Sequence, residues 1–317
     1  MDEWVYWILT CAFSLYFMLL LLEFNRPSHK LMEQIDSQAA RHQDMQRRLP
    51  HAHAQTEEMQ DRLAKLEHDM DDLEARGKDI LPDANKRLMV HIPVGPFTMG
   101  GRDEDSPRSE RPAHTVYQSA YYISKTPVTN QDYREFVQCT GHRAPVYWQR
   151  GTFPAAAGKH PVVNISWQDA RDYADWRSAR LLTESEWEKA ARGTDERLYP
   201  WGTRLTEGER CNANNQIGTT PVDEWPDGLS FYGVWDMAGN VYEWCYDHYD
   251  PDFYKDSPMT NPKSADGGQE RVIHGGSYQE TRAALRTTHR IGSSEVSTRD
   301  NIGFRLAMDA DDMQPGS

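Results

Sequence analysis

The sequence contains few cysteines, and their spacing matches no common metal or redox motif. There are four, at positions 11, 139, 211 and 245, with no Cys-x-x-Cys and no Cys/His pair at the spacing of a zinc site. A zinc finger and a dithiol redox centre are therefore excluded. We expect Cys139, Cys211 and Cys245 to be buried as small apolar side chains, with a Cys211–Cys245 disulfide as the alternative.

Clusters of basic residues are also absent. The 317-residue chain has 35 Lys and Arg against 49 Asp and Glu, which gives a formal net charge of −14 at pH 7. Non-specific binding of nucleic acid needs clustered cations that neutralise phosphates, so we exclude this class of partner. The hydrophobic content of 38% suffices for one core of about 200 residues or more. The charged content of 26% indicates an additional polar helix.

One long stretch carries no formal charge. It runs for 19 residues from Trp4 to Leu22, which as a helix covers a hydrocarbon core of ~30 Å. The residues before it, Asp2 and Glu3, differ from the basic start of a cleaved signal peptide, and no small-x-small cleavage site follows. Residues 1–25 are therefore predicted to form a single-pass transmembrane anchor.

Residues 26–82 are predicted to form a helical, coiled-coil stalk. Apolar residues recur there at alternating spacings of four and three, which is the pattern of a coiled-coil seam. The seam consists of Met59, Leu63, Leu66, Met70, Leu73 and Ile80, with Gly77 at the expected position between the last two. Pro50 divides the stalk into two helices, and Pro82 ends it. We predict that the stalk makes the protein a homo-oligomer, with a single solvated helix as the alternative.

From about residue 88 the composition changes to short apolar runs with many aromatic residues, Gly and Pro, which is typical of a globular α+β domain. Three helices are predicted from capping boxes, in which a Thr or Ser is followed by an acid three residues later. The pairs are Thr129 with Asp132, Ser166 with Asp169 and Thr183 with Glu186. Gly193 is expected to end the third helix in a left-handed conformation.

Two signatures near the carboxyl end carry a family resemblance. They are Arg-Val-Ile-His-Gly-Gly-Ser-Tyr from Arg271 to Tyr278 and Asn-Ile-Gly-Phe-Arg from Asn301 to Arg305. With earlier motifs in segments 90–101, 126–130, 161–167, 180–188 and 199–202, they resemble the formylglycine-generating enzyme (sulfatase-modifying factor) family. The resemblance implies a loop-rich, C-type-lectin-like α+β fold over residues 88–309, followed by a tail of residues 310–317.

The oxidase chemistry of that family is not expected here. Its oxidase members carry a copper-binding cysteine two positions after the Gly-Gly-Ser-Tyr/Trp motif and a second one five residues later. The matching positions in this sequence are Glu280 and Leu285. Neither a carboxylate nor an isobutyl group replaces a thiolate that holds Cu(I) and acts as a nucleophile. We therefore expect no copper and no formylglycine-generating oxidase activity.

The region that would hold the active site is interpreted as a binding surface. Its residues are Ser277, Tyr278, Glu280, Arg282, Arg286, His289 and Arg290. The arginines would bind an anionic group or a partner's carboxylates, and salt-bridged framework arginines are the alternative. A non-haem iron site would have to use His274, His289 and Glu280, whose spacing does not suggest a triad.

The resemblance also implies one calcium site, in the segment Asp236–Trp244. Its ligands would be the side chains of Asp236 and Glu243 and the backbone carbonyls of Gly239 and Val241, which are the oxygen donors that calcium prefers. The alternative is a metal-free turn in which Glu243 pairs with a nearby arginine.

These interpretations predict a membrane-anchored, non-catalytic recognition or assembly subunit of a membrane or periplasmic protein complex. Arg26 and Lys30 follow the anchor and favour a cytoplasmic domain by the positive-inside rule, whereas many anchored members of the resembled family face the periplasm. We favour a bacterial-type inner membrane with the domain in the periplasm. The alternative function is a metal-dependent oxidase-type enzyme that uses residues other than the missing cysteines.

Overall fold

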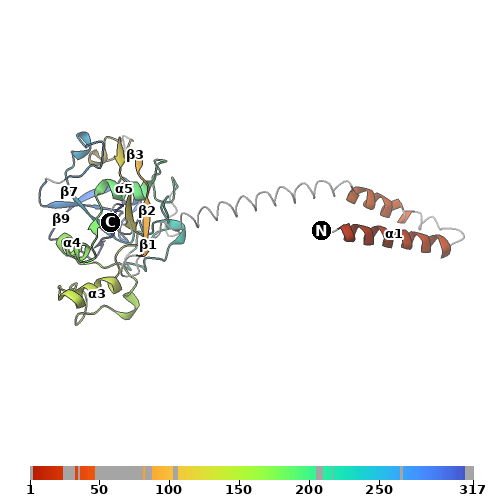
Figure 1. Ribbon diagram of the computed structural model, residues 1–317, viewed down its shortest axis with the longest axis horizontal. Helices are drawn as coiled ribbons and strands as arrows, with labels where there is room; N and C mark the ends of the chain where they lie inside the picture. Colours follow the sequence, from red (N-terminus) through yellow and green to blue (C-terminus); the bar gives the residue numbers. More distant parts are fainter. Residues whose placement is uncertain are drawn as a thin grey trace, which may run out of the picture. The chain divides into compact units, whose positions relative to one another are not determined.

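The computed structural model of the chain describes residues 3–23, 33–34, 36–46, 81–82, 88–102, 106–204, 210–215, 217–264 and 267–310. The chain divides into two compact units, Met1–Ala75 and Arg76–Ser317. The described part of the first unit is helical, and the second combines short helices with short strands (Figure 1).

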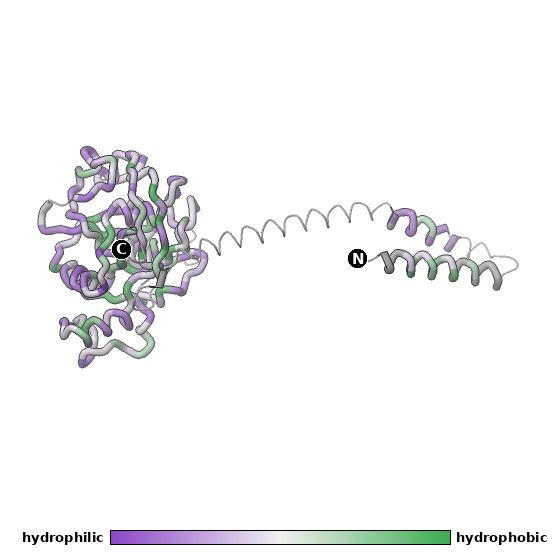
Figure 2. The backbone as a smooth tube through the Cα atoms, in the orientation of Figure 1, coloured by the Kyte–Doolittle hydropathy of each residue, from purple (hydrophilic) through white to green (hydrophobic). Residues whose placement is uncertain are grey.

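The first unit contains α1 (Glu3–Glu23) and a helical stretch over residues 36–46. α1 has 21 residues, with hydrophobic residues along its length (Figure 2). The ring of Phe13 in α1 stacks on the ring of His42, with centroids 5.1 Å apart. Among the described residues, no helix combines the length and the apolar character needed to cross a membrane. The structure thus shows a helix at the predicted anchor, and the membrane span stays a prediction.

The coiled-coil stalk is a separate prediction. Its seam, from Met59 to Ile80, lies outside the described residues. The oligomeric stalk therefore stays a prediction.

The second unit is built on a five-stranded sheet with the order β1-β2-β5-β11-β6, in which every neighbouring pair is antiparallel. Its strands are β1 (Leu81–Pro82), β2 (Leu88–Ile92), β5 (Tyr121–Ser124), β11 (Leu306–Asp309) and β6 (Arg180–Leu181). The last strand of the chain, β11, therefore lies inside the sheet between two earlier strands.

A four-stranded sheet and a two-stranded sheet complete the second unit. The larger has the order β10-β7-β8-β9, with β10 parallel to β7 and the other pairs antiparallel. Its strands are β10 (Ile302–Gly303), β7 (Tyr242–His248), β8 (Glu270–His274) and β9 (Arg290–Ser294). The smaller pairs β3 (Gly95–Met99) with β4 (His114–Gln118) in antiparallel fashion. The expected α+β architecture with short strands is confirmed.

Three α-helices lie where the capping boxes predict them. They are α3 (Asn130–Thr140), α4 (Trp167–Trp176) and α5 (Glu184–Arg192). Each begins after the predicted Thr or Ser, whose side chain accepts from the backbone N–H of the acid three residues later, and that acid accepts in return. Gly193 does follow α5 with a positive φ of 68°, but its ψ of −149° differs from the left-handed helical value that was expected.

Short 3-10 helices occupy several of the loops. They are η1 (Arg108–Glu110), η2 (Ala155–Ala157), η3 (Pro226–Gly228), η4 (Phe253–Lys255) and η5 (Arg282–Leu285).

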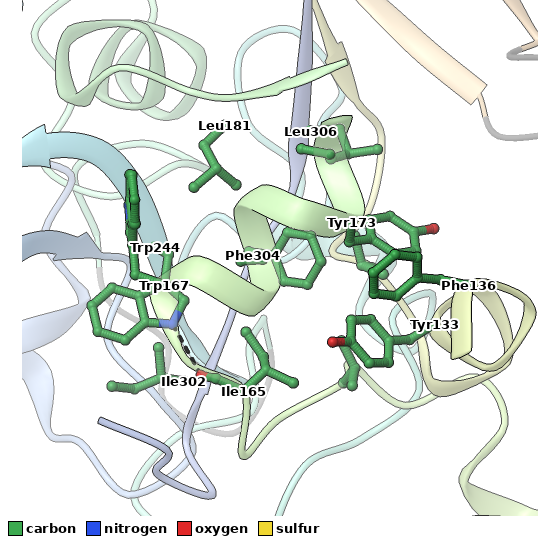
Figure 3. Close-up of a cluster of buried hydrophobic side chains, with 14 of the residues drawn as sticks. Tyr133, Phe136, Ile165, Trp167, Tyr173, Leu181, Trp244, Ile302, Phe304 and Leu306 are labelled. Carbon is green, nitrogen blue, oxygen red and sulfur yellow. Dashed lines mark hydrogen bonds between the residues drawn. The ribbon is translucent and has the colours of Figure 1, made fainter. Parts of the chain in front are cut away.

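The largest apolar cluster is rich in aromatic rings and includes residues of α3, α4 and the closing segment (Figure 3). Tyr133 stacks on Tyr173 with centroids 5.5 Å apart, and Phe304 meets both rings edge-on. Trp167 donates its indole N–H to the backbone oxygen of Cys245 at 2.8 Å. Trp167 and Phe304, which belong to the family motifs, thus pack in the core.

The expectations for the cysteines are confirmed in part. Cys211 and Cys245 are buried as predicted, and the alternative of a disulfide between them is wrong. Cys139 is exposed, because it lies near the end of α3 on a face that the core does not cover.

Candidate functional site

A sharp turn after β8 directs the chain into the predicted binding surface. Gly275 and Gly276 have φ values of 94° and 69°, which favour glycine. A Cβ on Gly276 would lie 2.7 Å from the backbone oxygen of Ala284, and one on Gly275 would lie 3.1 Å from the ring of Trp187. The Gly-Gly pair of the signature is therefore required by close packing, and it positions the residues that follow.

The two positions at which oxidase members carry cysteines differ in their surroundings. Leu285, the last residue of η5, is buried in an apolar cluster with Tyr199, Cys211 and Ala238. Glu280 is half-buried, and its carboxylate lies near enough to the hydroxyl of Tyr242 to affect the pKa of that hydroxyl. Burial, followed by the negative charge of Glu280, raises the pKa of Tyr242 well above its ordinary value. An apolar side chain at position 285 and a carboxylate at position 280 thus occupy the two positions where the oxidase members carry cysteines.

A row of polar contacts leads from Glu280 into the domain. The Tyr242 hydroxyl lies 3.4 Å from Nε2 of His289, and Nδ1 of His289 lies 3.5 Å from a carboxylate oxygen of Glu110. Burial raises the pKa of Glu110, but the neighbouring His289, the hydrogen bond from Thr288 and the charge of Arg286 outweigh it and hold the pKa below its usual value. Glu110 is therefore a buried carboxylate anion surrounded by donors.

Two of the three predicted arginines are framework residues. Arg286 makes a two-pronged contact with Glu110, at 2.7 and 2.8 Å. Arg290 is buried and pairs with both carboxylate oxygens of Glu184, one of them at 2.9 Å. Internal carboxylates therefore hold both arginines, which is the framework role named as the alternative, and the binding surface itself stays a prediction. Arg282 is exposed on η5.

The carboxylate of Glu184 is the centre of a buried ionic cluster. Nε2 of His274 lies 3.2 Å from it, and the hydroxyl of Tyr254 donates to it at 3.1 Å. Burial disfavours its charge, yet Arg290 and His274 lower its pKa to about 2. Sequence reasoning missed both Glu184 and Glu110. Glu184 could have been noticed as an acid in the first turn of a capped helix, whereas no local signal marks Glu110.

Ser277 and Tyr278 anchor the start of the surface. The Ser277 hydroxyl accepts hydrogen bonds from the backbone N–H of Gln279 and the side-chain amide of Asn301, both at 3.3 Å. The Tyr278 hydroxyl donates to Asp300 at 3.2 Å. These contacts join the two closing signatures at one place in the fold.

Three of the predicted calcium ligands lie on the segment that leads into β7, and Glu243 lies in β7 itself. Both carboxylate oxygens of Glu243 are engaged, because Arg305 donates to them at 2.6 and 2.7 Å and Trp187 adds a bond at 2.7 Å. This is the arginine pair named as the alternative. Asp236 is buried, and burial raises its pKa to about 8, although the charge of Arg305 opposes that shift.

The donor set suits calcium in part. Asp236 is a buried acid that accepts a long hydrogen bond of 3.4 Å from Asn240. The backbone oxygens of Gly239 and Val241 are the donor type that calcium prefers. Glu243 would have to share its carboxylate with Arg305. The calcium site therefore stays a prediction.

The residues of the alternative iron site are not brought together. His274 faces Glu184, while His289 lies near Tyr242 and Glu110. Within the described ranges, no three His, Cys, Asp or Glu side chains gather in a way that could hold a metal ion.

Comparison with known proteins agrees with this geometry. The family model FGE-sulfatase, a sulfatase-modifying factor enzyme 1-like domain, matches residues 78–310. The chain belongs to this family. The match overlaps the domain predicted for residues 88–309, and it confirms the resemblance carried by the two closing signatures.

Relatives in the family carry different names. The chain is 35% identical over 286 residues to a formylglycine-generating enzyme of Streptomyces coelicolor, with 71% of this chain and 90% of the relative covered. It is 31% identical over 289 residues to the mouse protein named inactive C-alpha-formylglycine-generating enzyme 2, with 73% and 88% covered.

Two solved structures support the fold. PvdO from Pseudomonas aeruginosa is similar with a TM-score of 0.63 at 26% identity, over 73% of this chain and 97% of that chain. Treponema denticola variable protein 1 has a TM-score of 0.58 at 23% identity, over 72% and 97% of the two chains, and bears on the fold alone.

Proposed function

We propose that this chain is a membrane-anchored recognition or assembly subunit that uses the family's fold without generating formylglycine. Positions 280 and 285 carry the proposal. Leu285 is 1% exposed and packs against apolar neighbours, and position 280 carries the half-buried carboxylate of Glu280. Formylglycine formation by the family's known route needs two thiolates at these positions, and neither residue provides one.

The relatives are compatible with a non-catalytic use of the fold. The name of the Streptomyces coelicolor relative states an enzyme, and the name of the mouse relative states an inactive one. The family fold therefore occurs in proteins with and without the reaction, which supports a binding role here.

The internal ion pairs suit a rigid recognition surface. Because Arg286 and Arg290 are held by Glu110 and Glu184, the loop between them is fixed to the core at both ends. A fixed loop loses little conformational entropy when a partner binds. Half-buried Glu280 and exposed Arg282, which come shortly before this loop, would make the outward contacts, and the partner would be another protein of a membrane complex.

The proposal includes attachment and assembly. Residues 1–25 would anchor the chain in a bacterial-type inner membrane, the stalk of residues 26–82 would make it a homo-oligomer, and the domain would face the periplasm. The support is the uncharged run from Trp4 to Leu22 and the heptad spacing from Met59 to Ile80. One calcium ion held by Asp236, Gly239, Val241 and Glu243 would stabilise the loop before β7.

A direct assay tests the central point. The full-length protein in detergent is incubated with a Cys-x-Pro-x-Arg peptide, copper and oxygen, beside the Streptomyces coelicolor relative as a positive control. We expect no aldehyde above background from this chain. A product formed at a rate comparable with that of the relative would refute the proposal.

The alternative of an oxidase-type enzyme that uses other residues is separated by a second measurement. Copper or iron retained stoichiometrically through purification would favour the enzyme, whereas calcium alone would favour the recognition subunit. A pull-down from native membranes with quantitative mass spectrometry would then identify the partner.

A further inference from the structure

A small pocket lies where three loops of the domain meet. It has a volume of about 100 Å³ and is lined by residues 143–146 after α3, residues 164–165 before α4 and Thr298 before β10, together with Tyr133 of α3 and Asp169 of α4. All of these residues belong to the unbroken described stretches 106–204 and 267–310. None of them is part of the binding surface or of the calcium segment described above.

A buried hydroxyl without a partner lines this pocket. Tyr133 is 0% exposed, and its hydroxyl makes no hydrogen bond to any part of the chain that the structure describes. In Figure 3 the hydroxyl points away from Phe136 and toward the side of the aromatic cluster where Ile165, another lining residue, lies. Burial, followed by the charge of Asp169, raises the pKa of Tyr133 well above its ordinary value, so the hydroxyl keeps its proton and can donate it. A buried donor of this kind indicates an acceptor from outside the fold.

The charged side chains of the pocket neutralise each other. Arg143 donates to both carboxylate oxygens of Asp169, at 3.0 and 2.6 Å. Asp169 also accepts from the hydroxyl of Ser166 at 2.6 Å, and Nε2 of His142 lies 2.9 Å from it. Of the lining residues, all of them described, only Arg143 and Asp169 carry a charge. An ion that entered would therefore lose its water without gaining a free countercharge, so the pocket suits a neutral group.

The other lining residues indicate the size and the shape of that group. Ala144, Pro145 and Ile165 offer apolar contacts, and Asn164 adds a side-chain amide that can both donate and accept. Small-molecule sites commonly have volumes of about 300 to 1,000 Å³, so this pocket is too small for a whole metabolite and suits one side chain. Val146 lines the pocket and is 79% exposed, so it can contact the residues on either side of that side chain.

We propose that this pocket receives the carboxamide side chain of an asparagine from a protein partner. The oxygen of the carboxamide would accept from the hydroxyl of Tyr133, and its apolar stem would lie against Ala144 and Ile165. A carboxylate of the same shape would bring a charge that the pocket does not balance, and an apolar side chain would leave the hydroxyl unpaired. The proposal rests on the recognition role proposed above and gives the partner a chemical feature.

Capped pentapeptides that carry one variable residue between glycines test the chemistry of the pocket. They are titrated into the full-length protein in detergent, and binding is followed by ligand-observed NMR. We expect saturable binding of the peptide with asparagine. The peptides with aspartate and leucine have side chains of similar size and should bind about three- to tenfold more weakly or worse, which is the effect of one lost hydrogen bond between neutral groups.

Two variants of the pocket and one control locate the binding. Tyr133→Phe keeps the ring, and it should weaken binding of the asparagine peptide by about three- to tenfold without weakening that of the leucine peptide. Ala144→Leu should abolish binding of both, because the larger side chain fills the pocket, and it keeps the test open if Tyr133→Phe does not fold. Tyr121→Phe is the matched control, since Tyr121 is also buried, donates to the backbone oxygen of Glu186 at 2.5 Å and does not line the pocket. It should bind the asparagine peptide as the wild type does.

Three outcomes would overturn the inference. The first is the absence of saturable binding of the asparagine peptide, and the second is equal affinity of the wild type and Tyr133→Phe for it. The third is an affinity for propionamide equal to that for the asparagine peptide, because the ligand would then be a free amide and not a partner's side chain. The aldehyde assay is independent of these titrations. Aldehyde production would refute the proposed function, whereas failed peptide binding without aldehyde would refute the pocket alone.

Discussion

Replacement of Arg305 by methionine would test whether the charge of Glu243 is neutralised by an ion pair or by a calcium ion. Arg305 and Glu243 are both completely buried and are joined by two short hydrogen bonds, at 2.6 and 2.7 Å. Methionine has a similar length and no charge, so Arg305→Met would leave the carboxylate of Glu243 in the interior with Trp187 as its remaining donor.

The expected loss is large. Removal of one partner from a buried pair costs about 3–5 kcal/mol, because the other charge is left without compensation. At about 2–4 °C per kcal/mol for a domain of roughly 220 residues, the melting temperature should fall by at least about 6 °C. Glu243→Gln should also destabilise the domain, and the double variant should lose less than the sum of the two, since neither charge is then left alone.

Thermal melts in chelator and in calcium show whether Arg305 alone or a calcium ion as well neutralises Glu243. If calcium binds, a hundredfold excess over its dissociation constant stabilises the wild type by about 2.7 kcal/mol, and Arg305→Met should lose less in calcium than in chelator. Lys159→Met is the control, because it removes an exposed pair with Asp223 and should leave the melting temperature nearly unchanged. Equal melting temperatures of the wild type and Arg305→Met in chelator would refute the ion-pair reasoning. Superimposable melts of the wild type in chelator and calcium would refute the calcium proposal.

Two further predictions concern α4 and the stalk. Burial raises the pKa of Asp169, but Arg143 and Ser166 outweigh it and lower the pKa to about 2 from an ordinary 3.8. The charge of Asp169 therefore stabilises the fold by up to about 2 kcal/mol above pH 4, and this contribution is lost as the pH falls toward 2. Asp169→Asn should flatten the loss of stability over that range in a pH series of urea melts, and the exposed Asp175→Asn on the same helix should not. A Leu66→Lys, Leu73→Lys double change should reduce the mass of the full-length protein in detergent, measured by light scattering, and an unaltered mass would exclude the coiled coil as the oligomerisation element.

Local signals predicted the elements of the fold well. Each capping box places its two partners three residues apart, so the starts of α3, α4 and α5 follow from the sequence alone. The prediction for Gly193 was right about its positive φ and its place at the helix end, and its ψ differs from the left-handed helical value. A Cβ there would also lie 2.7 Å from the ring of Phe231, so the backbone conformation and close packing against a distant residue both require glycine.

The partners of the binding-surface arginines could not be predicted in the same way. Arg286 pairs with a carboxylate 176 residues away, and Arg290 with one 106 residues away. The pairing of each arginine with its acid depends on how the loops pack, and no local sequence pattern predicts it. The binding surface itself stays a prediction, and the sequence could not show that internal carboxylates hold two of its arginines.

The closing signature from Asn301 to Arg305 contains residues that join two sheets of the domain. It therefore indicates the fold of the family and not its reaction. Ile302–Gly303 pairs with β7 in one sheet, and Leu306–Asp309 lies within the other. Arg305 stands between them and donates to Glu243 in β7 and to the backbone oxygen of Ser124 in β5. A residue that joins both sheets is required whether or not the protein is an enzyme. Positions 280 and 285 lie outside the strands, so the side chains there can differ without disturbing this link between the sheets.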